Sequence, residues 1–480
     1  MHWQAGGLSM ASALTKRAPA LLVLAASLLV LFLPAPDGAP AGFSAAAALT
    51  VFAIGFWAVG ALPEYLTAVC FFLLAMIFKV APASVVFSGF SAGALWLVFG
   101  GLIIAAGVQR TGLGKRIAEL LVGKLAGSYP RLITGVVLVS LALAFLMPST
   151  MGRVLLLVPI FLALADRMGF EPGSNGRTGM VVAVALSSFL GPAAILPANV
   201  PNNVLAGAAE AYHGITITYF DYLLLHFPVL GALKSALLVW LICRIFPDRV
   251  RPSTDGGQPP PEPRTKLSGD ERNLAIILGL ALAFFVTDTL HGISPAWISL
   301  AAGVACLLPM IAIVTPQGFR TDVQMGPLFY VAGILGLGAL VATSGVGDFL
   351  SRLLLDAVHL EEGADAYNFF ALSAIGMVLG MVATMPGIPA ILSPIAGDIA
   401  AATGMTLEQV LMLQVLGFST LVLPYQVPPV LVALQVGGVP MGQAARVTLP
   451  LVALTWVLLI PLDYLWWVAL GELSLPAFLL

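Results

Sequence analysis

The amino-acid sequence predicts an all-α protein that crosses a membrane many times. Of its 480 residues, 60% are hydrophobic and only 9% are charged, whereas a soluble protein carries about 25% charged residues. The apolar residues fall in blocks of roughly 20, the length that an α-helix needs to cross the bilayer. The 49 glycines and 34 prolines are numerous for helices that must satisfy their own backbone in lipid, so broken or re-entrant helices are expected among the spans.

Charge and residue spacing exclude several other classes of protein. The net charge of −2 provides no broad basic surface, so nucleic-acid partners are set aside. The cysteines each lie alone in an apolar run and the histidines form no regular spacing, so neither a disulfide framework nor a metal cluster is predicted. The sequence contains no H-E-x-x-H motif. We therefore expect no enzymatic activity and no organic cofactor.

The N-terminal segment, residues 1–43, is expected to contain the first transmembrane helix. Lys16 and Arg17 precede an apolar run at 20–33, a pattern that also occurs in cleaved signal peptides. Because many apolar segments follow and no soluble domain does, a retained helix is the favoured interpretation. Further spans are expected at 44–61, 65–80, 93–109, 178–211 with an interruption, 220–246, 273–290, 294–314 and 326–343, before an apolar region broken by prolines at 367–471.

A hydrophilic linker at 247–272 divides the chain into two halves, 44–246 and 273–480. The linker contains Pro259-Pro260-Pro261 and five basic residues, so it cannot cross lipid and is predicted to be cytoplasmic. Counting the spans from a cytoplasmic N-terminus places most other Lys and Arg residues on the cytoplasmic side as well. The sequence thus predicts an integral protein of the cell (inner) membrane with a cytoplasmic N-terminus.

The two halves repeat each other weakly. The run from Leu95 to Gly114 lines up without gaps on the run from Leu328 to Gly347. Short sequence motifs further along each half also match in the same order. Met147-Pro148 matches Met385-Pro386, and residues 196–201 match residues 423–428. Five spanning or re-entrant elements per half would place the two copies in opposite orientations, which is the inverted repeat of secondary transporters.

The repeat also explains a motif that resembles a protease signature. Gly345-Val346-Gly347-Asp348 spells the G-x-G-D of intramembrane aspartyl proteases, with Asp221 as a conceivable partner carboxylate. The position that matches Asp348 in the first half is Lys115. The glycines therefore indicate a helix end that is duplicated in both halves.

The first candidate site lies at an interruption in the apolar stretch 132–166. Basic residues at both ends of this stretch predict a re-entrant hairpin with its tip near residues 148–152. Ser149 and Thr150 supply neutral oxygens suited to Na⁺. Arg153 is the most informative residue, because an unpaired guanidinium at membrane depth costs several kcal/mol and usually has an anion or carboxylate partner. A snorkelling or interfacial Arg153 that orients the hairpin is the alternative.

The other candidate residues lie at three further interruptions. Asn199, Asn202 and Asn203 surround a proline in the span 178–211, which suits an unwound segment facing a polar cavity, although a Pro-kinked structural helix is the alternative. The second half contributes Thr384, in a hairpin predicted at 368–402, and Tyr425 with Gln426. Interrupted helices expose N–H groups and carbonyls that replace water around an ion.

Two ionisable residues lie inside predicted spans away from these interruptions. For Lys234, snorkelling or pairing is favoured over a functional role. Asp463 is either a proton-coupling carboxylate or an interfacial residue beside the aromatic pair Trp466-Trp467.

The residues that flank the fourth predicted span carry a family resemblance. Gly89-Phe90-Ser91, Leu95-Trp96-Leu97 with Gly100-Gly101, and Thr111-Gly112-Leu113-Gly114-Lys115-Arg116 resemble the divalent anion/sodium symporter family of dicarboxylate, citrate and sulfate transporters. The resemblance extends over the chain from about residue 40. It implies about 11 transmembrane helices plus two re-entrant hairpins, a homodimer, and an elevator-type movement of a transport domain against a scaffold.

The hairpins depart from the family pattern, in which each carries Ser-Asn-Thr. The first hairpin has Pro148-Ser149-Thr150-Met151 and lacks the asparagine, and the second has Met385-Pro386-Gly387-Ile388 after Thr384. The family places one Na⁺ at each hairpin and the substrate carboxylates between them. In this sequence the second cation site lacks its usual side chains.

The sequence therefore predicts a secondary transporter of a small anion (a di- or tricarboxylate, or a sulfate-like anion) that works by alternating access coupled to Na⁺ or H⁺. Ser149, Thr150 and Asn199 are the predicted Na⁺ ligands. Arg153, with the three asparagines, is predicted to bind the anion, and Thr384, Tyr425 and Gln426 to complete the site. A cation/proton antiporter and an anion channel of related architecture are the alternatives.

Overall fold

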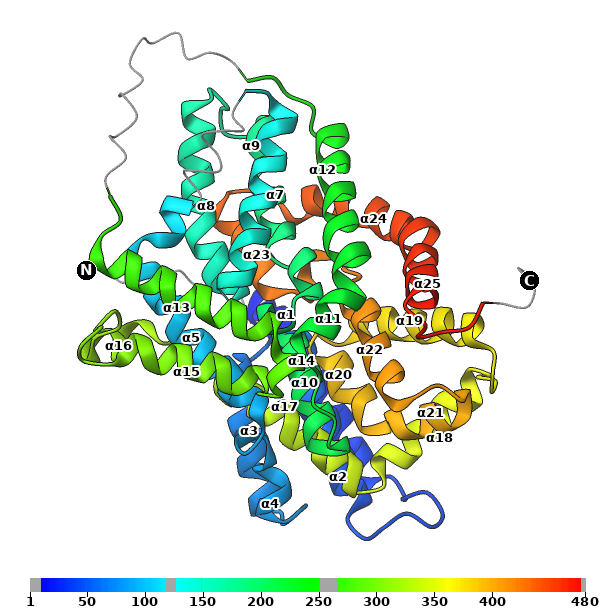
Figure 1. Cartoon of the computed structure of the whole chain (residues 1–480). Helices are drawn as coiled ribbons and strands as arrows, with labels where there is room; N and C mark the ends of the chain where they lie inside the picture. Colours follow the sequence, from blue (N-terminus) through cyan, green and yellow to red (C-terminus); the bar gives the residue numbers. More distant parts are fainter. Residues whose placement is uncertain (1–9, 118–126, 148, 251–265, 476–480) are drawn as a thin grey trace.

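Helices form all the regular structure of the part of the chain that the computed structural model describes, residues 10–117, 127–147, 149–250 and 266–475 (Figure 1). The prediction of an all-α protein is thus confirmed for these ranges. The first half consists of α1 Met10–Phe32, α2 Phe43–Val59, α3 Glu64–Ile77, α4 Ala83–Val86, η1 Ser88–Phe90, α5 Gly93–Thr111, α7 Tyr129–Leu146, α8 Thr150–Arg167, α9 Asn175–Ser187, η2 Gly191–Ala194, η3 Leu196–Ala198, α10 Val200–His213, α11 Tyr219–His226, η4 Phe227–Leu233 and α12 Lys234–Ile245.

The second half follows with α13 Gly269–Val286, α14 Asp288–His291, α15 Pro295–Leu307, α16 Pro316–Asp322, α17 Gly326–Thr343, α18 Val346–Ala357, α19 Asp365–Val382, α20 Gly387–Leu392, η5 Ser393–Ile395, α21 Ala396–Thr403, α22 Leu407–Phe418, η6 Pro424–Gln426, α23 Pro428–Val436, α24 Met441–Leu454, η7 Thr455–Leu459 and α25 Ile460–Ala469. Most of the linker, residues 251–265, and the tip residue Pro148 lie outside the described ranges.

Within the described ranges, seven helices are long and apolar enough to cross a membrane, and the number rises to eight if a pair bent by 118° is one span. Four shorter apolar helices accompany them. The protein is therefore a polytopic membrane protein, and the finer count of about 11 crossings stays a prediction. The span expected at 294–314 is shorter in the structure. Its helix α15 ends at Leu307, and the chain then turns through Ala312, which has a φ of 46°.

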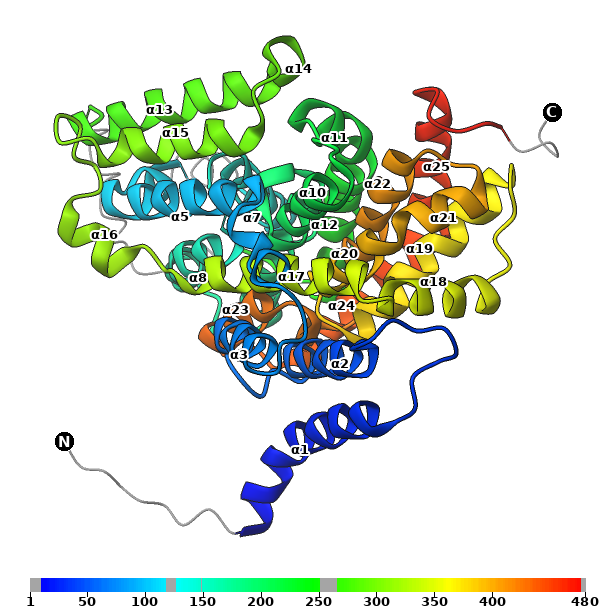
Figure 2. The ribbon, with the colours of Figure 1, turned by 90° about the horizontal axis from the view of Figure 1, so that it is seen from below.

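Helices on either side of the interrupted segments pack against one another. Helices α5, α13 and α15 lie side by side in both views, and α17 packs against α3, α5 and α10. Helix α1 lies apart from the rest of the molecule and contacts α2 (Figure 2). Its leucines are largely exposed, as expected for side chains that face lipid.

The helix that follows each interruption packs against helices of the other half of the chain. Helix α10, which follows the first interruption, contacts α20 and η5 of the second half. In the same way α23, which follows the second interruption, contacts α8 and α9 of the first half. The two interruptions are therefore held between the hairpin helices, which is the geometry that an inverted repeat produces around a central site.

Small residues allow α5 and α15 to approach closely. A Cβ atom at Gly100 would lie 2.3 Å from the carbonyl oxygen of Ser299, and one at Gly303 would lie 3.0 Å from the Cα of Gly100. The hydroxyl of Ser299 donates a hydrogen bond of 2.9 Å to the carbonyl of Leu97. Glycine contacts of this kind bring membrane helices together in the absence of a hydrophobic driving force.

We expect Gly100→Val to lower the temperature of thermal unfolding in detergent by at least about 5 °C, because the new side chain forces α5 and α15 apart. Thermal unfolding followed by fluorescence measures the effect. Gly279→Val on α13 is the matched control, since a Cβ there meets nothing within 4 Å. Equal unfolding temperatures for the two variants would contradict the assigned packing.

Candidate functional site

The interruption between α7 and α8 is the tip of the first predicted hairpin. Ser149 caps α8, because its Oγ accepts a hydrogen bond of 3.1 Å from the backbone N–H of Gly152. Serine is a favoured residue at this position, where its oxygen satisfies an otherwise unpaired N–H group. Helix α8 therefore begins at Thr150, and its first turn places both Thr150 and Arg153 inside the protein, where they are buried.

The Arg153 side chain is completely buried, and its two terminal nitrogens donate to protein oxygens, whereas its Nε has no hydrogen-bond partner in the described structure. Its Nη1 donates to the carbonyl of Met147 at 2.5 Å and to that of Ala198 at 3.2 Å. Its Nη2 donates to the carbonyls of Ser188 at 2.8 Å and Ala198 at 3.1 Å. These carbonyls belong to the hairpin tip and to both ends of the interruption between α9 and α10.

Two side-chain oxygens complete this shell. Nη2 of Arg153 also donates to Oγ1 of Thr150 at 3.3 Å and to Oδ1 of Asn199 at 3.1 Å. The Thr150 hydroxyl in turn donates to the same Asn199 oxygen at 2.7 Å. All five oxygens are neutral, and no carboxylate of the described residues pairs with Arg153. The guanidinium thus lies among the oxygens, including those of Thr150 and Asn199, that the sequence assigns to Na⁺.

The asparagines of the first interruption hold its unwound backbone. Asn199 donates through Nδ2 to the carbonyl of Phe189 at 2.9 Å. Asn202 donates to the carbonyls of Pro192 at 3.2 Å and Ile195 at 2.6 Å. The Oδ1 atoms of Asn202 and Asn203 are buried and accept no hydrogen bond within the described structure. Buried amide oxygens without a donor are unusual in proteins and are available to one from a ligand or water.

The second interruption is built differently. Gln426 accepts hydrogen bonds from the N–H groups of Val422 at 2.9 Å and Leu423 at 2.7 Å, and its Nε2 donates to the carbonyl of Gly380 at 2.5 Å. The Tyr425 hydroxyl donates to the carbonyl of Met381 at 2.7 Å. Both residues thus connect the interruption to α19, the first arm of the second predicted hairpin.

Thr384 lies at the tip of the second predicted hairpin, where its hydroxyl is 3.4 Å from that of Tyr330 on α17. The structure therefore does not join Thr384 to Tyr425 and Gln426 by a described hydrogen bond. In the repeat, the residue that matches Arg153 is Ile391. The buried guanidinium has no counterpart at this hairpin.

A different cation reaches the second interruption. The ammonium group of Lys234, on α12, is buried and donates to the carbonyl of Ser419 at 2.8 Å, with the Ser419 hydroxyl at 3.3 Å. Ser419 follows the last residue of α22, as Ser188 follows the last residue of α9. A side-chain cation therefore binds the C-terminal carbonyl of each helix that precedes an interruption, where the helix dipole is negative.

The sequence predicts the Thr150 and Asn199 side chains of this shell and backbone carbonyls near Asn199, and the carbonyl of Ala198 is one of these. Thr150, Arg153 and Asn199 do come together, whereas the Ser149 side chain caps α8 instead. The carbonyls of Met147, Ser188 and Ser419 had no signal in the sequence, because every residue type carries a carbonyl. Ser188 and Ser419 correspond only in their places in the structure, each directly after the helix that precedes an interruption.

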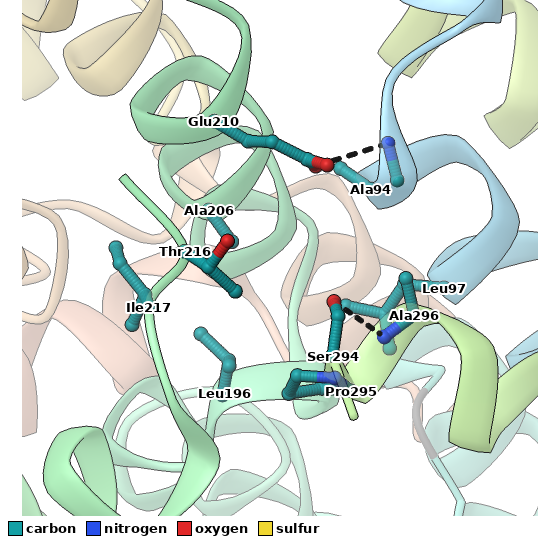
Figure 3. A pocket seen from close by; sticks show the side chains of 11 residues that line it. Ala94, Leu97, Leu196, Ala206, Glu210, Thr216, Ile217, Ser294, Pro295 and Ala296 are labelled. Carbon is teal, nitrogen blue, oxygen red and sulfur yellow. Dashed lines mark hydrogen bonds between the residues drawn. The ribbon is translucent and has the colours of Figure 1, made fainter. Parts of the chain in front are cut away.

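A small cavity lies elsewhere, between α5, α10 and α15 (Figure 3). Glu210 accepts a hydrogen bond of 3.1 Å from the N–H of Gly93 at its edge, and Ser294 caps α15 at 3.4 Å from the N–H of Ala296. The cavity shares Leu196 with the first interruption but none of the predicted site residues. Its polar groups serve helix ends, so it does not extend the candidate site.

Interrupted helices in a polytopic membrane protein, with basic side chains buried at the interruptions, are typical of membrane transporters. The chain belongs to the family described as the sodium:sulfate symporter transmembrane region, whose sequence model matches residues 14–473.

Several relatives agree with this membership. A membrane protein of Cupriavidus necator is 24% identical over 93% of this chain and 92% of its own length. An uncharacterized transporter of Mycobacterium tuberculosis is 28% identical over 66% of this chain and 72% of its own. An L-tartrate/succinate antiporter of Escherichia coli is 26% identical over 56% of each chain. The predicted family is thereby confirmed.

Proposed function

We propose that the protein is a secondary transporter of a small anion, a di- or tricarboxylate or a sulfate-like anion, and that the guanidinium of Arg153 takes the place of a Na⁺ ion at the first hairpin. The observation that carries this proposal is the shell of five neutral oxygens around one buried guanidinium. Carbonyl, hydroxyl and amide oxygens are ligands that suit a hard cation, and here a covalently attached cation lies among them.

The residues of the first hairpin do not fit Na⁺ together with Arg153. A cation placed among these oxygens would lie next to the guanidinium, and two positive charges in a buried site repel each other strongly. The second interruption offers no better set among the described residues, because Gln426 is bonded to backbone groups and Thr384 lies beside Tyr330. We therefore derive no transport step through Na⁺ at either hairpin.

A fixed positive charge has a consequence for the transport cycle. When Na⁺ and anion leave a symporter, the empty site loses both charges, whereas an attached guanidinium keeps its charge after the anion leaves. Moving that uncompensated charge through the membrane is costly, so the empty carrier is expected to return slowly. The carrier then works best as an exchanger that returns with a second anion. The name of the Escherichia coli relative, an antiporter of two dicarboxylates, supports the same mode.

The remaining parts of the proposal concern the assembly. We propose an inner-membrane homodimer in which the helices around the interruptions, α7 to α12 and α19 to α25, move as one body against the others. The packing of α10 against α20, and of α23 against α8 and α9, joins the two interruptions into one group of helices and supports this elevator-type movement.

Proteoliposomes test the proposed function directly. We expect uptake of labelled succinate, tartrate, citrate or sulfate to require an unlabelled anion inside the vesicle and to continue unchanged when K⁺ or choline replaces Na⁺. Accumulation that needs an inward Na⁺ gradient and no internal anion would instead establish a Na⁺ symporter. Uptake that only equilibrates each anion, without counterflow, would establish the channel alternative.

A further inference from the structure

Two buried ionisable side chains lie where two long spans depart from α-helical geometry. The span Tyr219–Ile245 contains the π-helical segment η4, directly before Lys234, and the span Met441–Ala469 contains the π-helical segment η7, four residues before Asp463. π-helical turns are rare and frequently occur at functional sites. An ionisable residue inside a membrane is costly and is a functional candidate by default.

Asp463 is fully buried, and neither oxygen of its carboxyl group has a hydrogen-bond partner in the described structure. The indole of Trp467 lies beside it, but the indole N–H forms no hydrogen bond of normal geometry. Trp467 is itself completely buried. The burial of both side chains leaves a carboxyl group without the donors that an ionised carboxylate requires.

Lys234 directly follows η4, and η4 packs against α25, the helix that carries Asp463. No ion pair within 4 Å joins the two side chains among the described residues. The ammonium group binds the carbonyl of Ser419 instead. The pair therefore connects a carboxyl group in α25 to the interruption in which Gln426 lies.

Helix α25 and the elements packed against it carry other titratable groups besides Lys234, but none of these places a fixed positive charge beside Asp463. They are Tyr219, Asp221, Tyr222 and His226 on α11, Asp365 and Tyr367 on α19, and Tyr464 on α25 itself. Asp221 and Asp365 accept hydrogen bonds from Thr218 and Ser474 at the span ends. His226 is buried between Tyr222 and Trp467, with ring centroids 4.7 Å and 6.0 Å away, and neither of its ring nitrogens has a described partner.

We propose that Asp463 is a proton-binding site whose occupancy is linked to anion binding. With Asp463 ionised, the pair of Lys234 and Asp463 is neutral. When a proton from water forms an O–H bond on the carboxyl group, the pair gains one positive charge at the second interruption. An anion in the site is stabilised by that charge, so anion binding takes up a proton and anion release returns it to water.

This inference rests on the proposed anion transport, and its test separates the two. The probe is sulfate, whose charge is constant in the range used. We expect purified protein in detergent to bind sulfate about tenfold more tightly at about pH 6 than at about pH 8, with uptake of about one proton or less per anion. Isothermal titration calorimetry in two buffers that differ in ionisation enthalpy measures both quantities.

The variants identify the group that binds the proton. Asp463→Asn keeps the shape of the protonated carboxyl, and we expect it to bind sulfate with the low-pH affinity of the wild type at both pH values and to take up no proton. Asp398→Asn, at an exposed carboxyl group on α21, is the matched control and is expected to retain the pH dependence. His226→Phe is likewise expected to retain it, and a loss of proton uptake in that variant would overturn the assignment to Asp463.

The other possible results distinguish failure of the proton-binding site from failure of the proposed anion transport. Sulfate binding by the wild type without proton uptake would overturn the proton site and leave the proposed function intact. Absence of binding of sulfate, succinate and citrate at both pH values would overturn the proposed function, and the linkage with it. If Asp463→Asn does not fold, the wild-type titration alone still distinguishes linked from unlinked binding.

Discussion

Arg153→Ala is expected to abolish anion exchange in Na⁺-free buffer, with a loss of at least about 100-fold in the initial rate. The substitution removes the donor for five oxygens that are held together in the protein interior. The Asn199 oxygen keeps its bond from Thr150 and the Met147 carbonyl keeps its bond from the N–H of Ser149, but the carbonyls of Ser188 and Ala198 lose the donor described for them. A buried acceptor without a partner costs about 1–3 kcal/mol, so we expect the hairpin tip and the first interruption to separate or fill with water. The positive charge next to the anion is lost at the same time.

The same variant distinguishes a tethered cation from an ordinary structural arginine. Because the emptied shell consists of hard neutral oxygens, we expect about 100 mM Na⁺ or guanidinium to restore part of the exchange in Arg153→Ala, and to leave wild-type exchange unchanged. Initial rates of labelled succinate counterflow in proteoliposomes, with K⁺ as the reference cation, measure the restoration.

Two variants control this experiment. Arg167→Ala removes an exposed guanidinium from the other end of α8 and is expected to transport normally. Arg153→Lys keeps the charge but reaches fewer of the five oxygens, so an intermediate rate is expected. Full wild-type exchange by Arg153→Ala in K⁺ buffer would remove the guanidinium from the mechanism.

The sequence predicts the side chains of the candidate site at positions where a polar residue interrupts an apolar run. Composition predicted the all-α membrane fold, and prolines and asparagines in the spans marked the interruptions at which Arg153 and Asn199 meet. The family membership followed from motifs near α5, and the comparison with known proteins confirms it. These features depend on residue type and spacing, which a sequence states directly.

The groups that bind the Arg153 guanidinium could not be predicted from the sequence. A buried guanidinium suggests a carboxylate or an anion, whereas the structure surrounds it with carbonyls from Met147, Ser188 and Ala198. These groups become available only because α7 and α9 end where they do, and helix ends depend on tertiary packing. Its role as a direct ligand of the transported anion stays a prediction, and its contacts favour a cation that acts through charge. Asp463 is a second example, because its position beside Trp466 and Trp467 in the sequence is equally compatible with an interfacial and with a buried side chain.

If Arg153 acts through its charge, neutralising that charge without disturbing the packing is expected to weaken anion binding. Asn199→Asp does this, because the new carboxylate has nearly the same shape and still accepts hydrogen bonds from Arg153 and Thr150. It replaces the bond from Nδ2 to the carbonyl of Phe189 by a repulsion between two oxygens, and the attraction between the new carboxylate and Arg153 opposes this cost. We expect the dissociation constant for sulfate or succinate to rise at least about 30-fold, since an attraction of about 2 kcal/mol or more is removed.

Stability is expected to move in the opposite direction in Asn199→Asp. A buried charge gains a partner of opposite sign, so the unfolding temperature should be equal to or higher than that of the wild type. Calorimetric titration and thermal unfolding of the same sample measure both effects, with Asn175→Asp as the control, because the amide of Asn175 is an exposed donor to the carbonyl of Pro247 far along the chain. Weaker binding together with lower stability would indicate a damaged fold. Weaker binding in a protein of undiminished stability would support an effect of charge at the first hairpin, and unchanged binding would show that anion binding does not depend on the positive charge of Arg153.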